Sequence, residues 1–237
     1  MRTWINGLLA WTNSIECEHD LFTGVQGYTR EMEFEWFSFG VRTCLPFSNP
    51  VMQMRCNFPP TWQRRYHDAS YLQIDPSVRR ACANPSPFVW DDDMFDQAPE
   101  FWEEAKSEGL RIGWACSLTH PSRQQSMVTL ARGHNRLLAS ELDANELKMR
   151  WLHESIAPCI ERLLVPRVYQ ACQYHLTARE TEVLRWTADG KTLDEIAQIL
   201  AISVDTVKFH VKNAMNKLGT TNKTAAVVRA AAMGMIS

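Results

Sequence analysis

Four residues in the first half of the chain combine hydrogen-bonding groups with large apolar surfaces: Trp62, Tyr66, Asp75 and Trp90. The indole N–H of a tryptophan can only donate a hydrogen bond, whereas an ionised carboxylate can only accept one. Each of these residues, taken alone, is more often part of a core than of a site. A carboxylate among aromatic rings nevertheless needs a hydrogen-bonding partner, so the four residues together are harder to explain as core alone.

Two lysines near the C-terminus, Lys208 and Lys212, lie one helical turn apart in a segment with a helical apolar pattern. That pattern is formed by Val204, Val207, Val211, Met215 and Leu218. Both lysines fall beside the apolar stripe, on a face from which ammonium groups can reach guanine edges or phosphates of DNA. The neighbouring candidates for contacts to DNA are Asp205, Thr206, Asn216, Lys191 and Thr192. The spacing alone also fits an ordinary helical bundle with solvated surface lysines.

The elements that must position these lysines are four short helices. They are expected at residues 176–190, 192–202, 203–219 and 222–236. Thr177 with Glu180, and Thr192 with Glu195, have the spacing of capping boxes, and Gly190 is a typical helix stop. The second and third helices are separated by only a tight turn. This arrangement predicts a helix-turn-helix whose third helix enters the DNA major groove.

The aromatic and acidic residues belong to a part of the chain in which strand-length apolar runs alternate with helical patterns. Strands are expected at residues 34–42, 51–58, 113–120 and 126–132, the last two joined as a hairpin through residues 121–125. Helices are expected at residues 17–32, 59–68, 98–109 and 140–164, and the last pattern ends near Pro166. Helices on both faces of one sheet define an α/β/α sandwich. The expected domains are an α/β/α sensor domain at 1–164, a linker at 165–175 and an all-α, four-helix DNA-binding domain at 176–237.

The composition agrees with two folded domains. The chain has 237 residues, of which 45% are hydrophobic, enough for substantial cores. No apolar run is long enough for a membrane span and no signal-peptide pattern stands at the start, so we expect a soluble, cytoplasmic protein without a membrane partner. The seven cysteines are odd in number and never in CxxC spacing, which argues against a disulfide framework or a zinc site. From residue 175 onward, eight basic and six acidic side chains permit a nucleic-acid partner without requiring one.

Patterns of catalytic residues do not occur in the sequence. The seven histidines are far apart, and the segment that begins at His153 lacks the second histidine of HExxH. Neither GxSxG nor GxGxxG occurs. We therefore expect no enzymatic activity, no bound metal and no cofactor.

Residues 176–234 resemble the DNA-binding domain of LuxR-family transcription factors almost without gaps. Glu180, Leu184 and Gly190 fall where the family keeps a glutamate, a leucine and a glycine, and the segments GKT, EIA, TVKFH, KL and NK are in register. Lys208 and Lys212 match the family's main DNA-reading positions. The resemblance implies a transcription regulator that binds double-stranded DNA, with RNA polymerase as a further partner.

Residues 58–80 and 87–113 resemble the family's quorum-sensing branch, the acyl-homoserine-lactone receptors, and the orphan receptors of that branch look most similar. Trp62, Tyr66, Asp75 and Trp90 stand at the four positions that define the receptors' pocket, and Gly113 matches another glycine of the branch. A phosphoacceptor receiver domain, which other members carry, is not expected. The acidic run at residues 91–93 lacks the strand framework of such a domain.

The resemblance implies roles for individual pocket residues. Trp62 would donate to the lactone carbonyl, and Asp75 would accept from the amide N–H. Thr129, with Ser38 as a second hydroxyl, is expected to donate to the amide carbonyl. Phe58 stands where several relatives carry a tyrosine, so the preferred 3-substituent stays open, and a non-lactone compound from a plant or host is the alternative ligand. The expected apolar walls are Tyr66, Trp90, Phe101 and Trp102.

The resemblance also implies a homodimer. The long helix at residues 140–164 is expected to form the interface and to set two recognition helices about one DNA turn, roughly 34 Å, apart on an imperfect palindrome. Ligand binding is expected to complete the sensor core, so that soluble yield rises with ligand.

Overall fold

The computed structural model describes residues 1–236 except 44, 46–47, 49, 121–123 and 169–174. The chain forms two compact units. The first contains Met1–Arg42, Met52–Thr119 and Gln125–Pro166, and the second is formed mainly by Arg167–Ser237. Within the ranges that the structure describes, no helix is long and apolar enough to cross a membrane.

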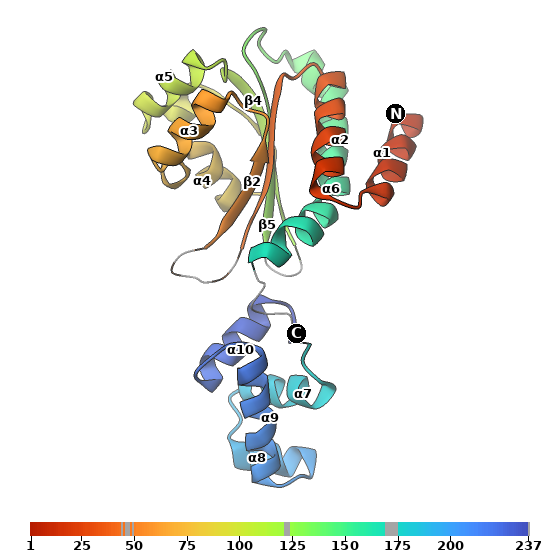
Figure 1. Cartoon of the computed structure of the whole chain (residues 1–237), viewed down its shortest axis with the longest axis vertical. Helices are drawn as coiled ribbons and strands as arrows, with labels where there is room; N and C mark the ends of the chain where they lie inside the picture. Colours follow the sequence, from red (N-terminus) through yellow and green to blue (C-terminus); the bar gives the residue numbers. More distant parts are fainter. Residues whose placement is uncertain (44, 46–47, 49, 121–123, 169–174, 237) are drawn as a thin grey trace. The chain divides into compact units, whose positions relative to one another are not determined.

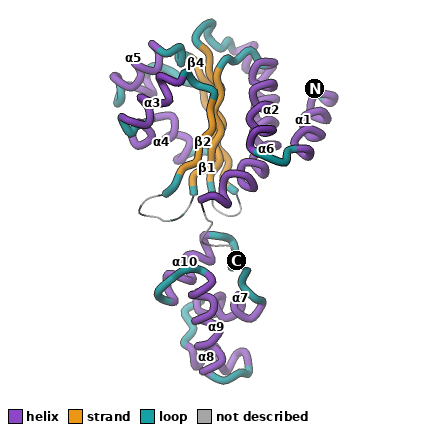
Figure 2. Tube along the Cα trace, viewed as in Figure 1, coloured by secondary structure: helices purple, strands orange, loops and turns teal. Residues whose placement is uncertain are grey.

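The first unit is built around one five-stranded antiparallel sheet (Figure 2). Its strands are β1 (Trp36–Arg42), β2 (Met52–Cys56), β3 (Phe88–Val89), β4 (Ile112–Thr119) and β5 (Gln125–Arg132). They lie in the order β2-β1-β5-β4-β3. All of these except β3 were predicted, and β4 pairs with β5 as the expected antiparallel hairpin. Strand β3 has two residues, too few to produce an alternating pattern in the sequence.

Helices cover both faces of this sheet, which confirms the predicted sandwich (Figure 1). On one face lie α3 (Pro60–Asp68), α4 (Pro76–Ala83) and α5 (Pro99–Ser107). On the other face lie α2 (Glu18–Glu31) and α6 (Ala139–Val168), with α1 (Arg2–Ser14) outside them. Two short 3₁₀ helices, η1 (Tyr71–Gln73) and η2 (Asp93–Phe95), pack with α3 and α5.

The alternation of side chains along β1 separates a core from a cavity. Phe37 and Phe39 are fully buried, and the Phe37 ring packs against Phe22 of α2 with 5.0 Å between ring centroids. Ser38 and Gly40 belong to the opposite face and line a cavity under α3, α4 and α5. One strand therefore contributes both to an apolar core and to a candidate site.

Some boundaries differ from those predicted. Helices α1 and α4 were not predicted, although α4 begins with a recognisable start signal, because Asp75 is its N-cap and Pro76 its first residue. Helix α6 continues through Pro166 to Val168, so the first residues of the predicted linker are helical. Proline lacks one backbone donor, but its φ angle is that of a helix. Residues 169–174 of the predicted linker lie outside the described residues.

The second unit contains the four predicted helices: α7 (Ala178–Ala188), α8 (Leu193–Leu200), α9 (Val204–Lys217) and α10 (Lys223–Ala232). Both capping boxes are present, at Thr177 with Glu180 and at Thr192 with Glu195. Helix α8 ends at Leu200 and is capped by Ala201, which has a left-handed φ of 52°. The Ser203 hydroxyl then accepts from the Thr206 N–H to start α9. The turn between α8 and α9 is therefore only three residues long, as a helix-turn-helix requires.

Candidate ligand pocket and nucleic-acid interface

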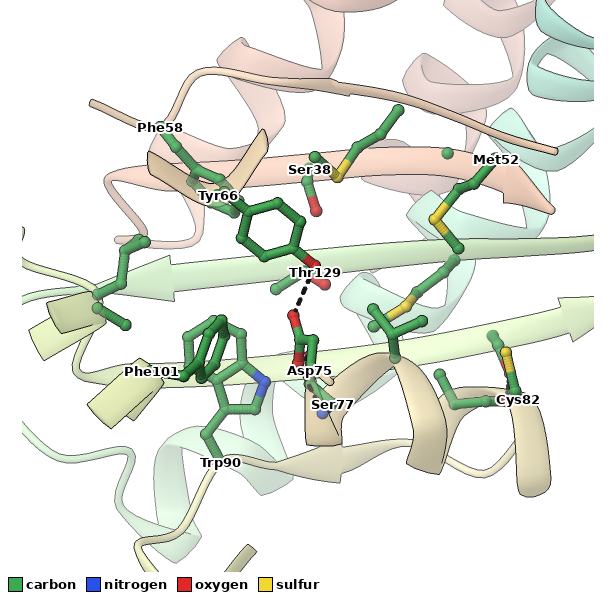
Figure 3. Close-up of a pocket in the computed structure, with 18 of the residues that line it drawn as sticks. Ser38, Met52, Phe58, Tyr66, Asp75, Ser77, Cys82, Trp90, Phe101 and Thr129 are labelled. Atoms are coloured by element: carbon green, nitrogen blue, oxygen red, sulfur yellow. Dashed lines mark hydrogen bonds between the residues drawn. The ribbon is translucent and has the colours of Figure 1, made fainter. Parts of the chain in front are cut away.

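A cavity of about 70 Å³ lies between the sheet and the layer formed by α3, α4 and α5. All nine residues predicted for the ligand site line it: Ser38, Phe58, Trp62, Tyr66, Asp75, Trp90, Phe101, Trp102 and Thr129. Figure 3 shows side chains from the sheet and from the helices facing this common space. The fold thus brings together residues that are widely separated in the sequence, while their role in binding remains a prediction.

Asp75 is held at the start of α4 by three donors. Its Oδ1 accepts from the Ser77 N–H at 2.8 Å and from the Ser77 hydroxyl at 2.7 Å. Its Oδ2 accepts from the Tyr66 hydroxyl at 2.9 Å across the cavity (Figure 3). Burial raises the pKa of the Asp75 carboxyl, and the hydrogen bonds from Ser77 and Tyr66 oppose that rise. A carboxylate oxygen has two lone pairs, so Oδ2 can accept one further hydrogen bond from a ligand.

The aromatic wall around Asp75 is tightly packed. Trp62 is 2% exposed, and its ring contacts those of Tyr66 and Phe101 at centroid distances of 5.9 and 5.5 Å. The Trp62 indole N–H makes no hydrogen bond within the described part of the chain, so it is free to donate to a ligand. The Trp102 indole N–H instead donates to Asp92 at 2.6 Å. Trp102 therefore contributes apolar surface and not a donor.

Trp90 lies directly against the backbone of Gly113 on β4. A Cβ atom at residue 113 would be 2.3 Å from the Trp90 ring, closer than any side chain can approach. The backbone N–H of Trp90 also donates to the Gly113 carbonyl at 2.7 Å. This contact explains the glycine noted in the sequence, because the ring can close this end of the cavity only over a residue without a side chain.

Two hydroxyls stand side by side on the floor of the cavity. Ser38 on β1 pairs in register with Thr129 on β5, and both are largely buried. Neither hydroxyl makes a hydrogen bond to another described residue. Both can therefore donate to a carbonyl oxygen placed above them, and their predicted contact to a ligand carbonyl stays a prediction.

Several lining residues were not predicted from the sequence. They are Gly40, Arg42, Met52, Met54, Ser77, Val78, Ala81, Cys82, Phe95, Ala105, Leu110, Ser117, Gln125 and Met127. The period of two along β1 and β5 was a usable signal for some of them. It places Gly40 and Arg42 on the face of Ser38, and Met127 and Gln125 on the face of Thr129.

Polar contacts tie α3 to α5 above the cavity. The Arg65 guanidinium donates to both carboxylate oxygens of Glu104 at 2.7 Å, and the Tyr71 hydroxyl donates to Glu104 at 2.8 Å. The Arg65 guanidinium and the Tyr71 hydroxyl lower the pKa of the Glu104 carboxyl. The Thr61 hydroxyl adds a bond to Glu108 at 2.6 Å. These bonds hold together the helices that carry Trp62 and Phe101.

In the second unit, Lys208, Lys212 and Asn216 are all exposed and follow one face of α9 at intervals of four residues. Lys208 pairs with Asp205 at 3.0 Å, and both side chains are exposed to solvent. Val207 and Val211 pack against Ile196 of α8 on the opposite face. The predicted lysines therefore lie on the free face of the third helix, where a major groove would be contacted.

Two other residues predicted to contact DNA form side-chain hydrogen bonds within the second unit. The Thr192 hydroxyl donates to Glu195 at 2.9 Å, and the Thr206 hydroxyl is 2.8 Å from that of Ser203. Lys191 is half-buried. Phe209 was not predicted, although its side chain is 59% exposed next to Lys208. In the sequence, this aromatic residue falls outside the apolar stripe of the helix, and that position was the signal that could have identified it.

No group of three or more metal-ligating side chains is present among the described residues. A sheet-and-helix domain with a pocket lined by aromatic and polar side chains, followed by a helix-turn-helix with an exposed lysine face, defines a ligand-responsive transcription regulator. The chain belongs to the LuxR family of bacterial regulatory proteins. Residues 18–158 match the autoinducer binding domain, and residues 174–230 match the family described as bacterial regulatory proteins, luxR family.

Proteins of known role are similar over almost the whole chain. The transcriptional activator protein AnoR of Acinetobacter nosocomialis is 34% identical and both chains are covered completely. The quorum-sensing regulator RhlR of Pseudomonas aeruginosa is 33% identical, with 98% and 96% of the two chains covered. The crystal structure of Escherichia coli SdiA has a TM-score of 0.90 at 32% identity and covers 99% of this chain and 98% of that one. These relatives regulate transcription and are not enzymes. The greater likeness to orphan receptors stays a prediction.

Proposed function

We propose that this chain is a receptor for an N-acyl homoserine lactone and that it regulates transcription as a dimer on a palindromic promoter element. The observation that carries the ligand assignment is the chemistry of the cavity. Among the described residues, one end holds the unpaired indole donors of Trp62 and Trp90, a carboxylate acceptor and two hydroxyls without a partner, and the rest is largely apolar. An acyl homoserine lactone has two carbonyls, one amide N–H and an apolar tail, which correspond to these groups.

Each polar group of the ligand has a candidate partner in the cavity. The Trp62 N–H suits the lactone carbonyl, Asp75 Oδ2 suits the amide N–H, and the Ser38–Thr129 pair suits the amide carbonyl. A hydrogen bond to the charged Asp75 contributes about 1.5–3 kcal/mol. Each buried methylene of the tail contributes about 0.8 kcal/mol. The head group and a tail of a few methylenes therefore contribute comparable binding energies. Because all acyl homoserine lactones share the same head group, the tail determines which of them binds most tightly.

The cavity of about 70 Å³ is much smaller than typical ligand pockets of roughly 300–1,000 Å³. We therefore expect the side chains that line the cavity to rearrange when a ligand binds. A ligand that binds only the folded state stabilises it by mass action. We thus expect thermal stability and soluble yield to rise together with ligand concentration.

A second class of ligand is supported by one relative. SdiA has a solved structure in complex with octanoyl-rac-glycerol, with a TM-score of 0.88 and 32% identity to this chain. That molecule keeps an acyl tail but has no lactone ring or amide. Phe58 lines the present cavity and has no hydroxyl for a polar substituent on the tail. A non-lactone acyl compound is therefore the alternative ligand.

The test is the melting temperature of the full chain against straight-chain acyl homoserine lactones of increasing length and against octanoylglycerol. A rise confined to lactones, lost in Asp75→Asn, supports the proposal. A rise with octanoylglycerol alone assigns the site to the alternative class. No rise with any compound would contradict a lactone receptor.

DNA binding through α9 is supported by the exposed Lys208 and Lys212, and a regulator that binds DNA is proposed to act in the cytoplasm. Dimerisation is supported by the large apolar side chains that the long helix α6 and its neighbour α1 expose, including Leu147 at 49% and Leu9 at 41%. RNA polymerase is a proposed further partner, because AnoR is a transcriptional activator. Sedimentation with and without ligand tests the dimer, and Leu147→Glu should shift it toward monomer. Footprinting on a palindromic site should then show protection of two half-sites.

A further inference from the structure

The cavity continues beyond the groups assigned to the ligand head. Along β1 and β5 the facing residues pair in register: Ser38 with Thr129, Gly40 with Met127 and Arg42 with Gln125. From the Ser38 pair to the Arg42 pair the strand advances four residues, roughly 13 Å. The floor of the cavity therefore leads from two hydroxyls, past glycine and methionine, to a guanidinium group.

The walls of this segment are apolar and adaptable. They are formed by Met52, Met54, Val78, Ala81 and Met127. Methionine side chains are flexible and fit an apolar chain without a fixed shape. Figure 3 shows Met52 and Cys82 at the end of the cavity opposite Trp90 and Phe101. An acyl tail attached to a head group near Asp75 would extend in this direction.

Arg42 lies at that far end, and it and Asp75 are the charged residues among those that line the cavity. It pairs in register with Met52 on one side and Gln125 on the other. Its guanidinium makes no hydrogen bond or ion pair to any residue that the structure describes. The neighbouring polar groups are already engaged, because Ser117 and Gln125 both donate to the Ala81 carbonyl, at 2.7 and 3.0 Å. Arg42 thus has unused donors at the end of an apolar channel.

We propose, building on the assignment of the cavity to an acyl ligand, that Arg42 is a specificity-determining residue for the end of the tail. An alkyl terminus that reaches Arg42 removes water from a guanidinium without replacing its hydrogen bonds, which costs binding energy. A terminus that carries a carboxylate accepts two parallel hydrogen bonds from the same group. Arg42 therefore limits the length of a plain alkyl tail and favours a tail that ends in a carboxylate.

The experiment compares two ligand series on the full chain: straight-chain acyl homoserine lactones of increasing length, and the same lactones with a terminal carboxylate. The concentration for half-maximal thermal stabilisation is measured for wild type, Arg42→Met and Arg64→Met. Arg64 is exposed on α3 and does not line the cavity, so its variant controls for loss of one positive charge.

In wild type, affinity should rise about fourfold per methylene and then fall once the tail reaches Arg42. At that length, the terminal carboxylate should improve binding by about tenfold or more. Arg42→Met should move the optimum to longer alkyl tails and abolish the carboxylate gain, while Arg64→Met should behave as wild type. If Arg42→Met does not fold, Arg42→Lys replaces it, and this variant should keep the length limit but lose part of the carboxylate gain.

An unchanged optimum in Arg42→Met would overturn the inference and leave the lactone proposal intact. If wild type binds the alkyl and the carboxylate-terminated lactones equally well at every length, that result alone would also overturn the inference and leave the lactone proposal intact. Failure of every compound to stabilise the protein would instead remove the proposed function, and this inference with it.

Discussion

The Tyr66 hydroxyl donates to Asp75 Oδ2 over 2.9 Å inside the cavity, so Tyr66 occupies one acceptor position of the carboxylate that we assign to the ligand. The contact joins α3 to the start of α4. It also satisfies a buried charge that would otherwise be unpaired. A ligand N–H that binds the same oxygen must share it with Tyr66 or displace the hydroxyl.

Asp75→Asn should abolish most of the ligand-induced rise in melting temperature. The asparagine can still accept hydrogen bonds through its carbonyl, but the bond to the ligand N–H loses its charged partner, which is worth about 1.5–3 kcal/mol. Tyr66→Phe is the matched control, because it removes the competing donor and leaves the carboxylate. It should keep a clear response to ligand. A full response in Asp75→Asn would remove Asp75 from the site.

The stability of the ligand-free protein should depend on pH through Asp75. Burial raises the pKa of this carboxyl above its ordinary value of 3.8, so the folded state binds the proton more tightly than the unfolded state. The resulting contribution to stability is fully present below pH 3.8 and is lost as the pH rises through the raised pKa. Over that window Asp75→Asn should gain stability relative to wild type in urea unfolding. Parallel pH curves for the two proteins would contradict this account.

Gly113→Ala should destabilise the first unit and weaken its response to ligand. The new Cβ would stand 2.3 Å from the Trp90 ring, so the ring must move, at a cost of about 1–3 kcal/mol. Gly27→Ala is the control, because a Cβ there meets nothing within 4 Å. That change lies inside α2 and should be neutral or stabilising by up to about 1 kcal/mol. Chemical unfolding of both variants, with and without ligand, measures the difference.

Lys208→Ala and Lys212→Ala should each weaken DNA binding without changing the thermal response to ligand. If a lysine contacts a phosphate, its removal should reduce the number of counterions released on DNA binding by about one, which lowers the slope of log affinity against log salt concentration. Lys208→Ala should have the larger effect, because it also leaves Asp205, its partner at 3.0 Å, as an unpaired negative charge near the DNA. Arg64→Ala, distant in sequence on α3, serves as the control. Loss of ligand response together with DNA binding would show that these lysines do not act in DNA recognition alone.

Local sequence was sufficient for the second unit. The capping boxes at Thr177 and Thr192 each depend on a glutamate three residues later, and both are present in the structure. Such pairs are decided within one helical turn, so no tertiary information is needed. The short turn at residues 201–203 and the free lysine face of α9 follow from the same local pattern.

The α/β/α sandwich and nine of the residues that line its pocket could also be predicted. The strand and helix periods and the residues around Asp75 can be recognised in the sequence itself. The strand register that pairs the residues of the floor, and the far end of the pocket, could not be predicted. Arg42 and Gln125 become neighbours only through the antiparallel register of β1 and β5, and the Ala81 carbonyl joins them through its hydrogen bond from Gln125. The Trp90–Gly113 contact likewise depends on a two-residue strand that has no sequence pattern of its own.

The sequence by itself determined most of the elements that form and which polar groups are available, because caps, periodicity and side-chain chemistry act over a few residues. Only the tertiary structure decided the order of the strands, the direction in which the cavity runs from Trp90 to Arg42, and which donors remain unused. Those properties depend on pairings between residues far apart in the chain, where many registers satisfy the same local pattern and packing selects one.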